Sequence, residues 1–342
     1  MENFTQHQRQ VMENLELTIV YCPIEIQLKK VKIKKKKHYQ LGPLYEFSGI
    51  DCIYNIMKLI KSITGNTPLI KISSKIYAKL ETYNPAGSVK DRMITYVVDK
   101  ARMFGKINET SILCDATSGN TGIALSMAAA SLNLPCLIFM PGNMSEERKQ
   151  MMKSYGAKII EAPDNDFVGA IAMRDQYLKA NDRAWSPMQF SNQDNVLCHQ
   201  YQTAPEIHKQ VIERKYLWSA FIHGAGTGGT MEGIRRYKEI QNLKTKLCLV
   251  QPVESPHGIQ GIADGKEFLF NSEDADKIIP IKTQDAIDRA QKFAQETGIL
   301  VGISSGANIL ASERYIENRL MSGIVVTMLC DRGERYMSIY GK

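Results

Sequence analysis

Short apolar runs rich in β-branched residues alternate with helical patterns along most of this chain of 342 residues. In the first half, strands are predicted at 76–80, 111–115, 135–140 and 158–160, and helices at about 88–104, 121–132 and 145–155. A second set begins near His199, with strands at 219–223, 247–250 and 324–329 and helices at 231–240 and 284–296. Such alternation is typical of a parallel sheet with helices on both faces. We therefore expect an α/β fold with two open lobes, each built on a mostly parallel sheet, that face one cleft.

The expected division is a lysine-rich extension over residues 1–55, one α/β lobe over 84–190, and a second lobe built from 56–83 with 191–342. Residues 1–48 carry a net charge of +3, so the remaining residues carry only +4 of the total of +7. The body therefore lacks the charge of a nucleic-acid-binding surface. We interpret the lysine run at 29–37 as a solvated tail. A contact with RNA or lipid, and an edge strand guarded by lysines, are the alternatives.

Composition favours a globular protein with a large core, because 44% of the residues are hydrophobic. No apolar run approaches the ~18 residues of a membrane helix, and residues 1–6 lack the pattern of a signal peptide. We expect a cytoplasmic location and no membrane partner. The seven cysteines lie scattered, mostly within apolar runs, without the paired spacing of a metal site. They are expected to be reduced core residues, and no metal site is expected.

A glycine-rich segment, Gly224-Ala-Gly-Thr-Gly-Gly-Thr230, joins a predicted strand to a predicted helix. Glycines let the backbone approach an anion closely, and the N–H groups and positive dipole end of the following helix attract it. The spacing of Gly224, Gly226 and Gly229 also fits a dinucleotide fingerprint, but Gln251 stands where that site needs an acidic residue. The segment therefore predicts a site for a small phosphate, with a plain strand-to-helix turn as the alternative.

Two further segments carry polar groups at predicted helix starts. In Asn84-Pro-Ala-Gly-Ser-Val-Lys90-Asp-Arg92, a lysine stands just inside a helix. The positive end of a helix repels an ammonium ion and favours the neutral amine, which can attack a carbonyl to form an imine. Asp115-Ala-Thr-Ser-Gly-Asn120-Thr-Gly122 gathers hydroxyls, an amide and backbone N–H groups that can wrap a carboxylate. A surface lysine and a capped turn are the alternatives.

Together these segments resemble the cysteine synthase family of pyridoxal-phosphate enzymes, meaning O-acetylserine sulfhydrylases and the catalytic core of cystathionine β-synthases. The resemblance spans roughly residues 62–340 and is closest to the B-type isozyme. Besides the three segments above, it rests on Gly65-Asn-Thr-Pro68, Met140-Pro-Gly-Asn-Met-Ser-Glu-Glu-Arg148, Met188-Gln-Phe-Ser-Asn192, Ile259-Gln-Gly-Ile262, Gly302-Ile-Ser-Ser-Gly306 and Cys330-Asp-Arg-Gly-Glu-Arg-Tyr336.

The resemblance implies the type II fold of pyridoxal-phosphate enzymes, similar to the tryptophan synthase β subunit, and a homodimer. It also implies pyridoxal 5'-phosphate as the cofactor, linked covalently to Lys90, with Asn120 against its ring hydroxyl and Ser304 against its pyridine nitrogen. The implied phosphate site is Gly226, Thr227, Gly228, Gly229 and Thr230. The implied site for the amino-acid substrate is Thr117, Ser118, Asn120, Thr121, Gln189 and Gly261.

The implied reaction is β-replacement on an amino acid, in which Lys90 also removes the Cα proton. A serine at position 304 cannot hold a proton on the ring nitrogen as an aspartate would, which favours loss of a β-leaving group. The leading hypothesis is L-cysteine synthesis from O-acetyl-L-serine and sulfide. The alternative is a lyase-like reaction of L-cysteine that releases hydrogen sulfide and yields serine, lanthionine or cystathionine. A scaffold protein would be expected to have lost Lys90 or the phosphate glycines, and a dehydratase usually has Asn-His at 120–121.

The chain departs from the family pattern in two places near the expected cleft. The stretch 251–260 is short where many relatives have a longer loop, so the substrate could differ. Gly261-Ile-Ala-Asp264-Gly265 replaces the common Gly-Ile-Gly-Ala-Gly. We interpret Asp264 either as a catalytic general base that activates the second substrate, a thiol or water, or as a solvated turn residue.

Overall fold

The computed structural model describes residues 59–117, 119–262, 269–317 and 322–341. The lysine-rich extension, Ser118 and Asp264 therefore lie outside the described residues. The strands are β1 (Leu69–Lys71), β2 (Ile76–Leu80), β3 (Ile112–Ala116), β4 (Cys136–Pro141), β5 (Lys158–Ala162), β6 (Ala184–Trp185), β7 (Trp218–Gly224), β8 (Lys246–Pro252), β9 (Lys277–Ile281) and β10 (Ile324–Leu329). The helices of six residues or more are α3 (Lys90–Met103), α4 (Asn120–Ser131), α5 (Glu146–Ser154), α6 (Phe167–Ala180), α7 (Gln193–Cys198), α8 (Ala204–Glu213), α9 (Gly229–Ile240), α10 (Thr283–Thr297) and α11 (Ile303–Ile316).

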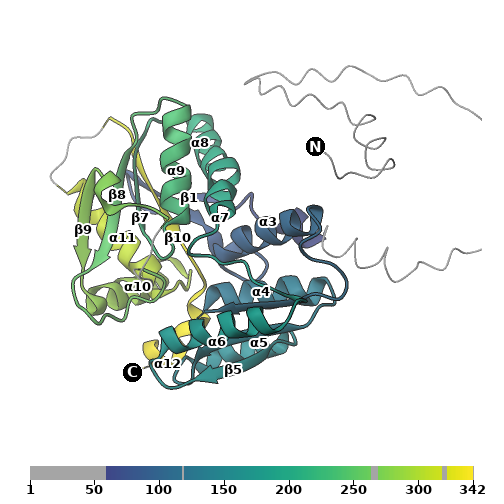
Figure 1. The fold of residues 1–342 in the computed structure, drawn as a ribbon. Helices are drawn as coiled ribbons and strands as arrows, with labels where there is room; N and C mark the ends of the chain where they lie inside the picture. Colours follow the sequence, from purple (N-terminus) through teal and green to yellow (C-terminus); the bar gives the residue numbers. More distant parts are fainter. Residues whose placement is uncertain (1–58, 118, 263–268, 318–321, 342) are drawn as a thin grey trace, which may run out of the picture. The chain divides into compact units, whose positions relative to one another are not determined.

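These strands form two sheets (Figure 1). The six-stranded sheet has the order β1-β2-β10-β7-β8-β9, and the four-stranded sheet has the order β5-β4-β3-β6. Every pair is parallel except β1 with β2. The predicted α/β fold with mostly parallel sheets is confirmed. The proposed lobe boundaries at 84–190 and at 56–83 with 191–342 stay a prediction.

Both faces of the six-stranded sheet are covered by helices. Successive side chains of a strand point to opposite faces, and here the side chains on both faces are apolar and must be buried. Phe221 on β7 packs in one cluster with Ile207 of α8 and Ile234 of α9. The next residue, Ile222, belongs to a second cluster with Ala307 of α11. Successive side chains of β7 thus face opposite helical layers, and the carboxyl end of the strand is left for the glycine loop.

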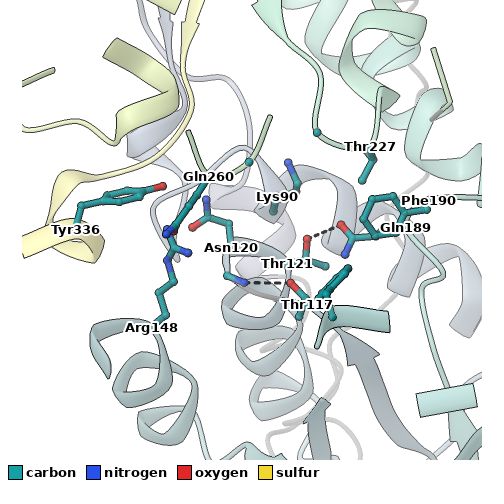
Figure 2. Close-up of a pocket in the computed structure, with 14 residues that line it drawn as sticks. Lys90, Thr117, Asn120, Thr121, Arg148, Gln189, Phe190, Thr227, Gln260 and Tyr336 are labelled. Atoms are coloured by element: carbon teal, nitrogen blue, oxygen red, sulfur yellow. Dashed lines mark hydrogen bonds between the residues drawn. The ribbon is translucent and has the colours of Figure 1, made fainter. Parts of the chain in front are cut away.

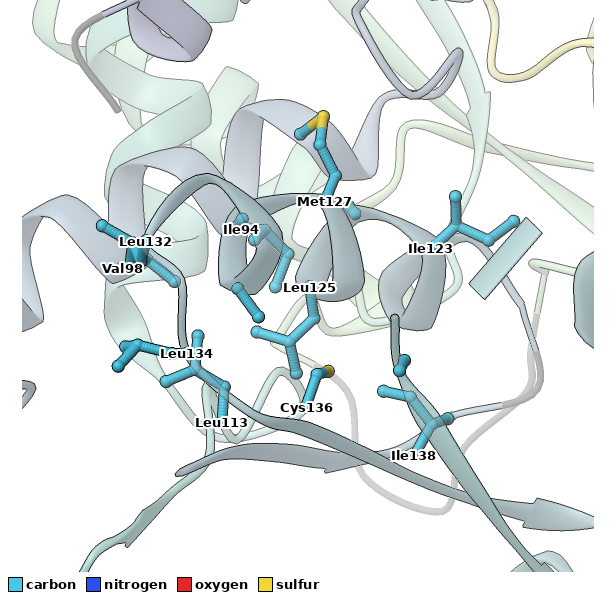
Figure 3. Packing of buried hydrophobic residues seen from close by; sticks show 14 of the residues in the cluster. Ile94, Val98, Leu113, Ile123, Leu125, Met127, Leu132, Leu134, Cys136 and Ile138 are labelled. Carbon is cyan, nitrogen blue, oxygen red and sulfur yellow. The ribbon is translucent and has the colours of Figure 1, made fainter. Parts of the chain in front are cut away.

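The four-stranded sheet packs against α3 and α4 (Figure 3). Leu113 of β3 and Ile138 of β4 lie against Ile94 of α3 and Leu125 of α4, and all four are fully buried. Ten of the twelve residues of α4 are buried, so this helix lies between the sheet and the rest of the protein. Its first turn, which contains Asn120 and Thr121, is held at the carboxyl end of β3.

The short helices and remaining connections complete the fold. A short π-helix at His199–Thr203 joins α7 to α8. Short helical turns lie at Glu81–Tyr83, Ser272–Asp274, Gly333–Tyr336 and α12 (Met337–Tyr340). The five described cysteines are all buried, as expected of core residues. Among the described helices, none is long and apolar enough to cross a bilayer.

Candidate functional site

A cavity opens where α3, the β3–α4 loop and the glycine loop meet (Figure 2). A second cavity shares Lys90, Asn120, Gly226, Thr227 and Gly261 with it. The structure therefore gathers around one place residues that are more than 170 positions apart in the sequence. Of the predicted site residues, the lining includes Lys90, Thr117, Asn120, Thr121, Gln189, Gly226, Thr227, Gly228, Gly229, Thr230, Gly261 and Ser304.

Lys90 is the first residue of α3 and is half-buried. The preceding turn is fixed by Asn84, whose amide Nδ2 donates to the carbonyl oxygens of Glu81 (3.0 Å) and Ser88 (3.1 Å). Ser88 Oγ in turn accepts from the backbone N–H of Lys90 at 3.2 Å. The Asn-Pro-Ala-Gly-Ser turn therefore sets where the lysine side chain enters the cavity.

The glycine loop leaves β7 at Gly224 and enters α9 at Gly229. Gly228 has a φ of +85°, which L side chains rarely adopt. A Cβ on Gly226 would lie 2.5 Å from the carbonyl oxygen of Gly261, and one on Gly229 would lie 2.2 Å from Asn195 Oδ1. Thr227 Oγ1 accepts from Asn195 Nδ2 at 3.0 Å, which holds the loop from behind. Side chains are thus excluded where the backbone lines the cavity.

The loop between β3 and α4 contributes Thr117, Asn120 and Thr121 to the same cavity. Thr121 Oγ1 donates to Gln189 Oε1 at 2.7 Å, which Figure 2 marks with a dashed line. Gln189 Nε2 donates to the buried carboxylate of Asp115 at 3.4 Å. The amide of Gln189 is therefore oriented by two polar partners. The free N–H groups of the first turn of α4 point in the direction that favours an anion.

Ser304 is the second residue of α11, lines the second cavity and is buried. It lies beside Cys330, whose pKa burial raises to about 12. His223 lines this cavity as well, and burial followed by the charge of Lys90 lowers the pKa of His223 to about 3. His199, next to Thr230 at 3.3 Å, has its pKa lowered well below the usual range, first by burial and then by Arg92 and Lys90. Both imidazoles are neutral near pH 7.

Several residues around the cavity were given no role in the sequence analysis. Arg148, Phe190, Gln260 and Tyr336 line it. The Arg148 guanidinium lies 4.8 Å from the centre of the Tyr336 ring. Figure 2 shows this pair on the side of the cavity opposite Gln189 and Phe190. Arg148 and Tyr336 each end a segment that carried the family resemblance, so the signal was present, but nothing in either segment indicated that the two ends meet.

Comparison with known proteins decides the family. Residues 60–331 match the family described as "Pyridoxal-phosphate dependent enzyme". The chain belongs to this family. It is 34% identical over 298 residues to a cysteine synthase of Staphylococcus aureus, a match that covers 82% of this chain and 95% of the relative. The resemblance to the cysteine synthase family is thereby confirmed, and with it pyridoxal phosphate as the cofactor.

Solved structures of the same family resemble this fold closely. A hydrogen sulfide-producing enzyme (Fn1055) from Fusobacterium nucleatum is 35% identical with a TM-score of 0.77, covering 84% of this chain and 91% of that one. An O-acetylserine dependent cystathionine beta-synthase from Helicobacter pylori is 31% identical with a TM-score of 0.74, covering 82% and 96%. The expected type II fold is confirmed by these neighbours.

The residues around the two cavities fit the family's cofactor. The glycine loop exposes backbone at the start of α9, where a phosphate needs N–H donors. A Cβ on Gly226, Gly228 or Gly229 would lie within 2.6 Å of a neighbouring atom, so only glycine fits at these positions. The carbonyl Oδ1 of Asn120 is buried and has no hydrogen-bond partner among the described residues. Buried polar atoms are rarely left in this state, so a ligand group that donates to Asn120 fits the site.

Proposed function

We propose that this protein catalyses β-replacement on an amino acid, and that its principal reaction is L-cysteine synthesis from O-acetyl-L-serine, or a related activated serine, and sulfide. The supporting observation is that the amine of Lys90, the uncharged loop at 117–121 and the glycine loop line two cavities that share five residues. The cysteine synthases among its relatives favour L-cysteine as the product. The O-acetylserine dependent cystathionine beta-synthase among its structural neighbours favours O-acetyl-L-serine as the donor.

In this proposal, Lys90 holds the cofactor covalently and Gly226 to Thr230 hold its phosphate. Asn120 faces the ring hydroxyl and Ser304 faces the ring nitrogen. The bound cofactor would act as an electron sink for the bond that breaks at Cα. Thr117, Ser118, Asn120, Thr121, Gln189 and Gly261 would bind the amino acid.

The protein's own groups then account for the proton movements. The amine of Lys90, once displaced by the substrate's amine, takes the proton from Cα. The loop at 117–121 holds the carboxylate through N–H groups and hydroxyls, so Cα stays next to Nζ of Lys90. Acetate leaves from Cβ, sulfide forms the new C–S bond there, and Lys90 returns the proton to Cα. Buried walls around the cavity limit the access of water that would compete with sulfide.

A second candidate is release of hydrogen sulfide from L-cysteine, with water or another thiol as the nucleophile. It is supported by the likeness to hydrogen sulfide-producing enzymes of Fusobacterium nucleatum. Asp264 is the proposed general base for either nucleophile. It lies outside the described residues, so this role rests on the sequence alone.

One experiment separates the two candidates. The purified holoenzyme is incubated with O-acetyl-L-serine plus sulfide, and separately with L-cysteine alone, and the amino-acid products and free sulfide are quantified. We expect faster cysteine formation in the first mixture than sulfide release in the second. The opposite ranking would make sulfide release the principal reaction, and no product in either mixture would contradict β-replacement.

Thr121→Val should test the amino-acid site independently of the cofactor. The change removes the hydroxyl that donates to Gln189 at 2.7 Å and leaves Gln189 less well oriented. A lost buried hydrogen bond costs about 1–2 kcal/mol, so the KM for the amino acid should rise about 10-fold. The visible absorbance of the bound cofactor should stay unchanged. A changed absorbance with an unchanged KM would place Thr121 at the cofactor instead.

We further propose that the protein is a cytoplasmic homodimer, as is expected for this family. Light scattering on the purified full-length chain measures the mass directly. A mass of about one chain at micromolar concentration would contradict the dimer.

A further inference from the structure

Asp331 connects the two sheets beside the cavity. Asp331 follows β10, the strand of the six-stranded sheet that comes last in the sequence. Its side chain contacts Asn120, the first residue of α4, which packs on the four-stranded sheet. The carboxylate is fully buried. Its Oδ2 accepts from Asn120 Nδ2 and from the Tyr336 hydroxyl, both at 2.7 Å. The bond to Asn120 joins residues that are 211 positions apart in the sequence.

The backbone around Asp331 fixes the position of this carboxylate. Asp331 pairs with Ser88 in an isolated antiparallel bridge, and its carbonyl oxygen accepts from the N–H of Gly302 at 3.0 Å. A Cβ on Gly302 would lie 2.1 Å from Asp331 Oδ1. Glycine at position 302 therefore leaves the room that the carboxylate occupies, only two residues before Ser304.

The chemistry of the three groups decides which way the Asn120 amide faces. A carboxylate can only accept hydrogen bonds, so the amide nitrogen of Asn120, and not its oxygen, must face Asp331. Burial and the charge of Asp331 raise the pKa of Tyr336 well above its usual value. Tyr336 therefore keeps its proton and acts as the second donor. If the Asn120 amide rotated by half a turn, its Oδ1 would face the Asp331 carboxylate. Two acceptor oxygens would then lie next to each other without a hydrogen between them.

The Oδ1 atom and the second N–H of the Asn120 amide are not bonded to Asp331. Asn120 lines both cavities, whereas Asp331 is not among the described residues that line either. The carbonyl Oδ1 of Asn120 is buried without a hydrogen-bond partner among the described residues. One carbonyl oxygen and one N–H of the amide thus remain for a ligand.

We propose that Asp331 is a positioning residue that fixes the orientation of the Asn120 amide and so determines which amide groups meet the ring hydroxyl of the cofactor. This rests on the proposed function, which places that hydroxyl against Asn120. Asp331 acts through Asn120 and does not touch the cofactor. Because Asp331 follows β10 of the six-stranded sheet and Asn120 begins α4 on the four-stranded sheet, the amide is oriented only when the two sheets are in their described arrangement.

The test compares four variants of the full chain in the absence of any amino-acid substrate: Asp331→Asn, Asn120→Ala, the double variant, and Asp276→Asn. Asp276 also accepts two donors, Lys246 Nζ at 2.6 Å and the N–H of Leu247 at 2.8 Å, but it lies outside both cavities and serves as the matched control. The measurements are the affinity of each cofactor-free protein for pyridoxal phosphate and the visible absorbance band of the loaded protein. Asp331→Ser replaces Asp331→Asn if the latter does not fold.

We expect Asp331→Asn to weaken cofactor affinity about 10- to 100-fold, the range for a lost hydrogen bond to a charged group. It should shift the absorbance band in the same direction as Asn120→Ala. The double variant should match Asn120→Ala within about 2-fold, because the two residues act as one unit. Asp276→Asn should change neither measurement.

Two outcomes would overturn the inference. If Asp331→Asn weakens affinity by the same factor with and without Asn120, then Asp331 acts independently of the amide. If Asp331→Asn lowers only the melting temperature and leaves the absorbance band in place, its role is structural. If Asn120→Ala shows an unchanged absorbance band and an unchanged cofactor affinity, then Asn120 does not contact the cofactor. That result would contradict this part of the proposed site, and not only the role of Asp331. None of these measurements depends on which amino acid is the substrate.

Discussion

Lys90→Ala is expected to give a protein that no longer retains pyridoxal phosphate covalently and has lost turnover by at least about 10³-fold, about 4 kcal/mol in the barrier. The reason is that one amine has two proposed tasks, the covalent link and the transfer of the Cα proton. Activity is measured as cysteine formed from O-acetyl-L-serine and sulfide. The covalent link is measured by borohydride reduction and mass determination of the intact chain.

Lys100→Ala is the control for this variant, because Lys100 lies on the same helix but pairs with Asp194 outside the cavity. Its activity and its cofactor content should equal those of the unmodified protein. Full activity in Lys90→Ala would exclude Lys90 as the base. Loss of the covalent link with activity retained would show that another group moves the proton.

Gly228→Ala is expected to weaken binding of pyridoxal phosphate by about 10²-fold. The new Cβ would lie 2.6 Å from the backbone nitrogen of Phe270, so the loop must move away from its described position. About two charge-assisted hydrogen bonds to phosphate, each worth about 1.5 kcal/mol, would then be lost. Cofactor affinity is measured by titration of the cofactor-free protein.

Gly156→Ala is the control that separates the steric clash at Gly228 from the cost of the backbone conformation. Gly156 has a φ of +84° against +85° for Gly228, but a Cβ on Gly156 would meet nothing within 4 Å. Both variants therefore share the cost of the left-handed backbone, about 1–2 kcal/mol of stability. Only Gly228→Ala should lose cofactor affinity. Equal affinities in the two variants would argue against the glycine loop as the phosphate site.

The strands of both sheets were the most predictable part of the fold. The predicted strands at 76–80 and 324–329 agree with the structure to the residue. Every residue of both strands is buried. The run Ile-Val-Val-Thr-Met-Leu of β10, which pairs in parallel with both neighbours, shows the apolar, β-branched pattern most clearly. The two-residue strand β6 has too few residues to produce any pattern.

Among the helices that were not predicted, α11 has a local sequence that opposes its conformation. α11 begins Ile303-Ser-Ser-Gly306, and glycine and serine are poor helix formers. The helix forms because its first seven residues are buried against the six-stranded sheet, which only the folded chain supplies. Here tertiary packing outweighs the local preference.

The candidate site also contains a part that the sequence predicts and a part that it does not. Lys90 and the glycine loop were predictable, because each carries its chemistry within a few consecutive residues. The bond from Asp331 to Asn120 was not, since a pairing across more than 200 residues leaves no trace in either segment. The segment from Cys330 to Tyr336 indicated the family, but it did not indicate that Asp331 contacts Asn120.

The strand order of the six-stranded sheet also determines when it can be completed during synthesis. β10 lies between β2 and β7 and pairs with both, so Val325 meets Ile76 across about 250 residues. The four-stranded sheet draws all its strands from residues 112–185 and can close much earlier. Until β10 emerges from the ribosome, β2 and β7 each expose an unpaired edge. Since such edges promote association between chains, the nascent protein depends on β10 (Ile324–Leu329) to hide them.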